Sequence, residues 1–266
     1  MHPALEQVRG LLIDLDGVVY TGRQAVPGAA AFLTTARERG LPFLLVTNNS
    51  TTPPEQVAER LAGMHIDVRS DEVLTSAEAA MAYVRANGPG TARVLVVGEA
   101  GLRQAAAHQA LEVVDDGQAD WVVAGLDRTF DYRKLARATR AIRAGARFLA
   151  SNTDALLPIE SGEVLPGAGS IVAAIRAATG VEPVVVGKPE PTLFQHALEK
   201  LGRLQPEQAA MVGDRLDTDV DGGHKAGLKT ILVLSGMTDR ALLATSTIKP
   251  DAVADDLASV ANLLGW

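Results

Sequence analysis

The feature that most constrains the fold of this chain is its alternation of two kinds of segment. Short apolar runs rich in β-branched residues alternate with Ala-rich amphipathic segments along the whole sequence. The runs have the length of buried strands, and the segments between them have the pattern of helices packed on one face. Such alternation is typical of a parallel sheet covered on both faces, so we predict an α/β fold with a doubly wound parallel sheet. The predicted strands are residues 11–14, 43–47, 94–98, 121–125, 147–151, 183–187, 209–213 and 230–234. The predicted helices include residues 28–39, 54–63, 76–86, 131–144, 169–178, 191–201 and 219–226.

Composition sets the broad class of the protein. Hydrophobic residues make up 47% of the 266 positions, which is ample for one large core or two modest ones. No apolar run approaches the ~20 residues that span a bilayer, and the start, MHPALEQVRG, lacks the pattern of a signal peptide. We therefore expect a cytoplasmic protein without a membrane partner. The sequence has no cysteine, which excludes disulfides and thiol nucleophiles, and its net charge of −7 without a basic block argues against nucleic acid as a partner.

Polar residues end four of the predicted strands, which read LLID-LDG, FLLVTNN, VVVGKP and AAMVGDRLDTD. Ligands of open α/β sheets bind beyond the carboxyl ends of the strands, so these four ends are expected to converge on one crevice. A separate α/β-rich stretch lies between the second and the third of them. We therefore predict a discontinuous Rossmann-like core formed by residues 1–77 and 183–266, with an α/β domain of residues 78–182 inserted into it.

Two aspartates interrupt the first apolar run, LLIDLDGVVY. An unpaired carboxylate inside a buried strand is costly, so Asp14 and Asp16 are expected at the open end of the strand, with a chemical role. The two-residue period of a strand places both on the same side, with Leu15 opposite. Gly17 then allows a tight turn away from the sheet.

Four more carboxylates fall within eight residues just after the strand 209–213. Like charges at this density repel one another unless a cation lies among them, and oxygen ligands without His or Cys favour Mg²⁺. Two of the four have simpler interpretations: Asp217 is favoured as a helix N-cap, and Asp221 is expected on a solvated helix face. The four residues are Asp214, Asp217, Asp219 and Asp221.

Hydrogen-bond donors, in contrast to these carboxylate acceptors, lie at the ends of two other strands. Thr47 with the backbone beyond it, and Lys188, offer the hydroxyl, N–H and ammonium groups that phosphoryl oxygens require. Lys188 and Pro189 are also predicted to open a helix, whose N-terminus would favour an anion. A carboxylate nucleophile, Mg²⁺ and a phosphate clamp together indicate phosphoryl transfer through an aspartyl-phosphate.

These motifs resemble those of a known family. DLDGV, the strand end Thr47-Asn48-Asn49, Lys188 and GDRLDTD are similar, in order, to the four motifs of the haloacid dehalogenase-like (HAD) hydrolases. Within the inserted region and at its end, SNTD (151–154), LPGAGS (165–170) and GKPEP (187–191) resemble the NagD-type, p-nitrophenyl-phosphatase-like phosphatases, which carry a large α/β cap of type IIA. The resemblance spans nearly the whole chain.

The resemblance implies a catalytic and a metal-binding role for the aspartates. Asp14 would be the nucleophile, and Asp16 would protonate the leaving oxygen and then activate water. Mg²⁺ would be held by the Asp14 carboxylate, the Asp16 backbone carbonyl and Asp214, with Asp219 supporting it through water.

The resemblance also implies the residues that bind substrate. Thr47, the backbone of Asn48, and Lys188 would hold the phosphoryl group. Asn152 and Asp154 lie where the family has the specificity loop of its cap, and a turn-forming role for them is an open alternative. Oligomerisation through the cap is common in the subfamily, so a homo-oligomer is among the states that the resemblance allows.

The function predicted from the sequence is that of a Mg²⁺-dependent phosphatase acting on a small phosphorylated metabolite. A phosphotransferase or phosphomutase shares the intermediate and stays open as an alternative, whereas four intact motifs disfavour a non-catalytic metabolite-binding protein. A dehalogenase of the superfamily would typically lack an acid at position 16, and an ATP-driven pump would have threonine there. Leu157 stands where the pyridoxal-phosphate phosphatases have histidine, which disfavours that substrate, and the apolar Leu156-Leu157 pair suggests a small or partly apolar leaving group.

Overall fold

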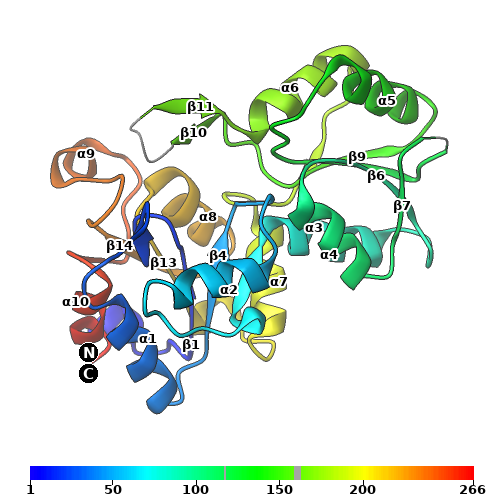
Figure 1. The fold of residues 1–266 in the computed structure, drawn as a ribbon. Coiled ribbons are helices and arrows are strands. Elements are labelled where there is room, and N and C mark those ends of the chain that lie inside the picture. The colour runs from blue at the N-terminus through cyan, green and yellow to red at the C-terminus, as the bar shows by residue number, and fades with distance from the viewer. Residues whose placement is uncertain (117, 159–162) are drawn as a thin grey trace. The chain divides into compact units, whose positions relative to one another are not determined.

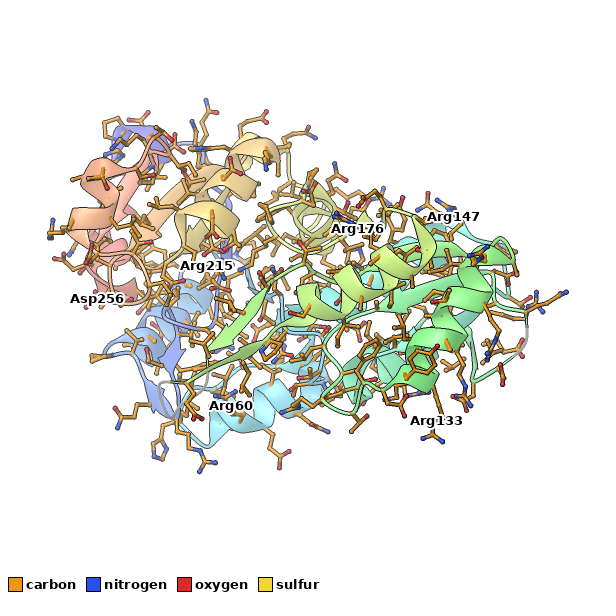
Figure 2. All side chains as sticks on the ribbon, turned by 90° about the horizontal axis from the view of Figure 1, so that it is seen from above. Arg60, Arg133, Arg147, Arg176, Arg215 and Asp256 are labelled. Carbon is orange, nitrogen blue, oxygen red and sulfur yellow. The ribbon has the colours of Figure 1, made fainter. Side chains whose placement is uncertain are left out.

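The computed structural model describes residues 1–116, 118–158 and 163–266. The chain divides into two compact units (Figure 1). The first unit comprises residues 1–47, 55–74 and 188–266, and the second comprises residues 48–54 and 75–187. Charged side chains cover the surface of both units, as Arg60 of the first and Arg133 and Arg176 of the second illustrate (Figure 2). Among the described helices, none combines the length and the apolar character needed to cross a membrane.

The first unit is built on a six-stranded sheet. Its spatial order is β15 (Ala252–Ala254), β14 (Lys229–Val233), β13 (Ala209–Gly213), β1 (Gly10–Ile13), β4 (Phe43–Thr47) and β5 (Val73–Thr75). β1 pairs in parallel with both β13 and β4. All four residues of β1 are buried, which explains its continuous apolar sequence. A short hairpin of β2 (Tyr20–Thr21) and β3 (Gln24–Ala25) follows β1.

Helices and single turns connect these strands. The helices are α1 (Ala29–Glu38), α2 (Pro54–Ala62), α7 (Pro191–Lys200), α8 (Asp221–Lys225), α9 (Arg240–Thr245) and α10 (Leu257–Leu263). The turns are 3₁₀ turns η1 (Pro3–Leu5), η2 (Ser70–Glu72) and η3 (Pro206–Gln208), and a π-helical turn η4 (Leu216–Val220). Leu11 and Ile13 of β1 belong to one buried apolar cluster with α1 and α10.

The second unit is built on a wholly parallel five-stranded sheet. Its order is β12 (Val184–Val185), β9 (Arg147–Ala150), β8 (Trp121–Ala124), β6 (Arg93–Val97) and β7 (Glu112–Val114). Its helices are α3 (Ser76–Asn87), α4 (Ala100–His108), α5 (Tyr132–Arg143) and α6 (Ala168–Thr179). β10 (Leu156–Pro158) and β11 (Val164–Pro166) form a separate two-stranded antiparallel sheet.

The predicted α/β class with parallel sheets is confirmed, but one strand belongs to the other sheet. The run 183–187, assigned to the core from its sequence, forms β12, which pairs with β9 of the second unit. Two of the crossings between the compact units lie after Leu74 and after Gly187, near the boundaries after residues 77 and 182 that we predicted for the inserted domain, whose extent stays a prediction. A run of valines fits the edge of either sheet, so the sequence does not specify which edge it joins.

Candidate active site

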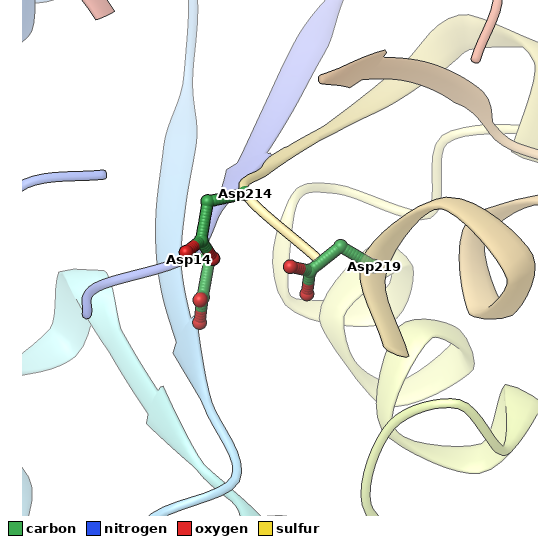
Figure 3. Close-up of side chains that lie close together, drawn as sticks. All are labelled: Asp14, Asp214 and Asp219. Carbon is green, nitrogen blue, oxygen red and sulfur yellow. The ribbon is translucent and has the colours of Figure 1, made fainter. Parts of the chain in front are cut away.

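Three buried aspartates meet at the carboxyl edge of the first sheet. Asp14 follows β1 and Asp214 follows β13, and the parallel pairing of these strands places the two residues side by side. Asp219 comes from the π-helical turn η4. One carboxylate oxygen of each lies within 4.8 Å of the others (Figure 3). Asp14 and Asp214 thus lie together at the edge of the sheet, as their positions after parallel strands predicted.

Two glycines make room for Asp214. Gly17 has a φ of +81°, which side chains rarely adopt, and a Cβ at this position would collide with Oδ2 of Asp214. A Cβ at Gly236, in the loop after β14, would collide with the same oxygen. The backbone N–H of Met237 in that loop donates a hydrogen bond to Oδ2 over 2.6 Å. This loop was not singled out from the sequence, although its small residues directly follow a strand of the same sheet edge.

Lys188 lies among the aspartates. Its ammonium group donates hydrogen bonds to Oδ1 of Asp14 over 2.6 Å and to Oδ1 of Asp219 over 2.7 Å. Burial alone would lower the pKa of Lys188, but the two carboxylates more than offset this effect, so its pKa lies above the usual value. Lys188 therefore stays charged.

The cluster has more negative than positive charge. Burial raises the pKa of Asp14 well above its usual value, and the neighbouring carboxylates Asp219 and Asp214 add to the rise, against the opposing effect of Lys188. Burial, with the charge of Asp219, raises the pKa of Asp214 to about 6. Three carboxylates facing one ammonium group form a site that is short of positive charge.

The donors present fit a divalent cation. Oδ1 of Asp214 is buried and has no hydrogen-bond partner among the described residues. A buried carboxylate oxygen without a hydrogen-bond partner is unusual, and such an oxygen ordinarily serves as a ligand to an ion or water. The ligands within reach are all oxygens, which is the preference of Mg²⁺. Asp14, Asp214 and Asp219 could therefore hold that ion.

Asp16 has a different environment from Asp14. It is exposed, and its Oδ2 accepts a hydrogen bond from the Tyr20 hydroxyl over 3.2 Å. Burial and the neighbouring Asp16 raise the pKa of Tyr20, so its hydroxyl remains a donor. The Arg60 guanidinium lies 4.5 Å from the centre of the Tyr20 ring. Sequence reasoning missed both residues: the hairpin β2–β3 that positions Tyr20 has strands of only two residues, and Arg60 lies in helix α2 outside every motif.

Of the predicted phosphate-binding residues, Thr47 is the last residue of β4, the other neighbour of β1, and Asn48 directly follows it. Thr47 is buried at the end of this strand. The carbonyl oxygen of Asn48 accepts hydrogen bonds from Ser76 Oγ over 2.6 Å and from Asn152 Nδ2 over 2.7 Å. These two bonds hold the Asn48–Asn49 peptide, which is the peptide next to the one that carries the Asn48 N–H.

Asn152 and Asp154, predicted as parts of a specificity loop, contact Asn48. Nδ2 of Asn48 donates to Oδ2 of Asp154 over 3.0 Å, and the Asp154 N–H donates to Oδ1 of Asn152 over 3.1 Å. The second bond is the Asx turn that the alternative interpretation anticipated. A role for these residues in contacting substrate stays a prediction.

Two local predictions were wrong. Asp217 does not cap a helix: it lies within η4 and forms an ion pair with Arg215 at 2.7 Å, and the hydrogen bonds from Arg215 lower its pKa. The helix after Lys188 starts at Pro191 rather than Pro189, so Lys188 lies in the turn before it. Asp221 pairs with Lys225, as a residue on a solvated face can.

Comparison with known proteins identifies the family. A family model described as "Haloacid dehalogenase-like hydrolase" matches residues 11–112, and a second model, of HAD-like hydrolases, matches residues 185–260. An acid sugar phosphatase of Staphylococcus aureus is 42% identical over 253 residues, covering 95% of this chain and 96% of the relative. The chain belongs to the HAD-like hydrolases.

Solved structures agree with this assignment to the HAD-like hydrolases. A 4-nitrophenylphosphatase from Thermotoga maritima superposes with a TM-score of 0.91 at 35% identity, covering 98% of this chain and 99% of the other. A glycerol phosphate phosphatase from Mycobacterium tuberculosis, solved with magnesium, has a TM-score of 0.88 at 39% identity and covers 98% of this chain and 78% of its own. The expected class of HAD-type phosphomonoesterase is confirmed, since all three relatives are phosphatases.

Proposed function

We propose that the protein is a Mg²⁺-dependent phosphatase that hydrolyses a small phosphate monoester through an aspartyl-phosphate intermediate. The observation that carries the proposal is the buried cluster of Asp14, Asp214 and Asp219 around Lys188, in which one carboxylate oxygen has no partner among the described residues. Such a cluster is costly to bury without a function.

Mg²⁺ would be held by the Asp14 carboxylate, the Asp16 backbone carbonyl and Asp214, with Asp219 supporting it through water. When bound, the ion supplies positive charge that allows an anionic carboxylate and an anionic phosphate to approach one another. The residues themselves supply the rest of the chemistry.

Asp14 attacks the phosphorus atom, and the bond from phosphorus to the leaving oxygen breaks. Asp16 gives its proton to that oxygen, so the alcohol leaves neutral. Asp16, now a carboxylate, then takes a proton from water as the water oxygen attacks phosphorus. This second step releases phosphate and restores Asp14.

The phosphoryl oxygens would be held by Lys188, the Thr47 hydroxyl and the backbone N–H of Asn48. These donors would stabilise the charge that the equatorial oxygens carry in the transition state. The hydrogen bonds to the Asn48 carbonyl support this role. They hold the Asn48–Asn49 peptide, which is joined through the Asn48 Cα to the peptide that carries the Asn48 N–H.

The core and the inserted region of the chain would have different functions. The core, predicted as residues 1–77 and 183–266, would carry the chemistry, and the inserted region, predicted as residues 78–182, would select the substrate. The relatives named above act on sugar phosphate, 4-nitrophenyl phosphate and glycerol phosphate, which supports a small phosphorylated metabolite as the substrate class.

The test is phosphate release from a panel of phosphate monoesters, with Mg²⁺ or with EDTA, by the wild type, Asp14→Asn and Asp217→Asn. Turnover should require Mg²⁺, disappear in Asp14→Asn and persist in Asp217→Asn, the matched control from the same acidic stretch. Turnover that survives in Asp14→Asn would refute the nucleophile. Phosphate transfer to an added alcohol, with no release to water, would instead identify a phosphotransferase.

A further inference from the structure

The carboxyl edge of the second sheet holds a loop of the chain itself. Ligands of parallel sheets bind at this edge, and here it is the segment 48–54 that packs there. Gly125 directly follows β8, and a Cβ added to it would lie 2.5 Å from the Ser50 hydroxyl oxygen, closer than a real Cβ approaches. Gly187 closely follows β12, and a Cβ added to it would lie 2.7 Å from Oδ1 of Asn48. The absence of both side chains lets the segment lie against the ends of the strands.

Two buried side chains of the second unit hold the carbonyl oxygen of Asn48. The Ser76 hydroxyl donates to it over 2.6 Å from the first residue of α3, and Asn152 Nδ2 donates to it over 2.7 Å from just beyond β9. The two bonds match the two lone pairs of a carbonyl oxygen. Neither donor belongs to the segment 48–54, so the direction of this carbonyl depends on residues that are distant in the sequence.

The Ser76 hydroxyl is not needed by its own helix. The cap of α3 is the preceding residue, Thr75, whose Oγ1 accepts a hydrogen bond from the Glu78 N–H over 3.2 Å. Alanine has a higher helix propensity than serine, so it would serve α3 at least as well at position 76. The Ser76 hydroxyl instead donates to a carbonyl outside the helix, and we therefore assign its role to the loop that it holds.

The carbonyl held in this way lies next to the N–H that we propose binds phosphate. The two groups are separated by the Asn48 Cα, so only two backbone dihedrals relate their directions. Before this Cα the chain is fixed by β4, which ends at Thr47, and after it by the bonds from Ser76 and Asn152. The direction of the N–H is thus constrained from both sides. A donor with a fixed direction stabilises developing charge without reorganisation.

We infer that Ser76 and Asn152 are positioning residues for the Asn48 N–H. The inserted stretch, beyond selecting the substrate, thereby helps to bind the phosphoryl group that all substrates share. This inference rests on the proposed function, in which the Asn48 N–H contacts phosphate. It requires that loss of either side chain weakens the binding of different phosphate esters by similar factors, and the binding of inorganic phosphate as well.

The test is a calorimetric titration of the full-length protein with inorganic phosphate in the presence of Mg²⁺. Inorganic phosphate has no leaving group, so its affinity reports on the phosphoryl site alone. Ser76→Ala and Asn152→Ala should each weaken binding about threefold to tenfold, the effect of one hydrogen bond. The double variant should lose more than the product of the two single effects, because it leaves a buried carbonyl without either side-chain donor. Values of kcat/KM for 4-nitrophenyl phosphate and for glycerol phosphate should fall by matching factors.

The matched control is Thr75→Val, which removes the neighbouring hydroxyl and keeps the shape of the side chain. It should lower the free energy of unfolding in urea, because the helix cap is lost, yet bind phosphate as the wild type does. Weakening of phosphate binding in Thr75→Val to the extent seen in Ser76→Ala would reduce the effect to general destabilisation and overturn the inference. Unchanged phosphate affinity in Ser76→Ala and Asn152→Ala, with kcat/KM reduced for only one ester, would also overturn it, since the two residues would then act on the leaving group.

The proposed function can fail separately from this inference. A wild type that binds phosphate but releases none from any ester would refute the phosphatase, and the ratios of phosphate affinity would still decide the role of Ser76 and Asn152. A wild type that binds no phosphate would overturn the inference itself.

Discussion

The ammonium nitrogen of Lys188 lies 2.6 Å from Oδ1 of Asp14, although 174 residues separate the two in the chain. The same nitrogen lies 2.7 Å from Oδ1 of Asp219. One buried lysine thus compensates part of the charge of two carboxylates. Its removal should affect stability and catalysis together.

Lys188→Met should therefore be impaired in both respects. The loss leaves buried carboxylates without their cation, which we expect to cost about 3–5 kcal/mol in the free energy of unfolding of the metal-free protein. Turnover by the folded variant should fall about 10²–10³-fold, because a donor to the phosphoryl oxygens is lost. Urea unfolding in EDTA and kcat/KM measure the two effects. Lys225→Met, at an exposed ion pair, is the control and should change neither by much.

Asp214→Asn should separate stability from metal binding. Without metal, the substitution removes repulsion between Asp214 and Asp219, so the variant should be as stable as the wild type or more so. The stabilisation that added Mg²⁺ confers on the wild type should disappear in the variant, because a ligand is lost. Thermal unfolding with EDTA and with Mg²⁺ measures both effects. A variant still stabilised by Mg²⁺ to the wild-type extent would remove Asp214 from the metal site.

Tyr20→Phe should slow the reaction without weakening substrate binding. The substitution removes the hydroxyl that donates to Asp16 and keeps the buried ring beside Arg60. We expect kcat to fall by about threefold to tenfold with KM almost unchanged, because a neutral hydrogen bond contributes on the order of 1 kcal/mol. Tyr83→Phe is the matched control, since no hydrogen bond of the Tyr83 hydroxyl is described and its ring packs edge-on against Trp121. A parallel rise of KM in Tyr20→Phe would indicate a disturbed substrate site.

Glu72 should make stability sensitive to acid. Its carboxylate accepts two hydrogen bonds from Arg37, over 3.0 and 2.6 Å. Burial would raise the pKa of Glu72, but the bonds from Arg37 and from the backbone of Arg69 outweigh it, so its pKa lies below the usual value. A carboxyl group with a lowered pKa stabilises the fold above its unfolded-state pKa, and this contribution is lost as the pH falls through the folded-state pKa.

The measurement is the free energy of unfolding of the wild type and Glu72→Gln from neutral pH down to pH values below the usual pKa of glutamate. The wild type should be more stable by about 1–3 kcal/mol at neutral pH, and the difference should shrink as the pH falls below about 4. Glu38→Gln, at an exposed position of α1, is the control and should show no such dependence. A difference that is independent of pH would mean that the charge of Glu72 is not responsible.

Strand-end reasoning succeeds where a residue follows a long buried strand. Asp14 and Asp214 could be placed together because their strands are apolar runs, and parallel strands end at one edge. The strand β12 was assigned to the wrong sheet, because its apolar run does not specify a partner. The short strands of β2 and β3 leave no pattern, so the bond from Tyr20 to Asp16 could not be anticipated. The bond from the Met237 N–H is a backbone bond, which no side-chain pattern encodes.

The chain passes between the two units next to residues of the proposed site. The chain passes from the first unit to the second after Thr47 and after Leu74, and it returns at Glu55 and at Lys188. The first and the last of these four crossings adjoin groups that we propose bind phosphate. A chimera could vary much of the interior of the stretch 75–187, whereas one residue added or removed next to Thr47 or Lys188 would displace a phosphate-binding group.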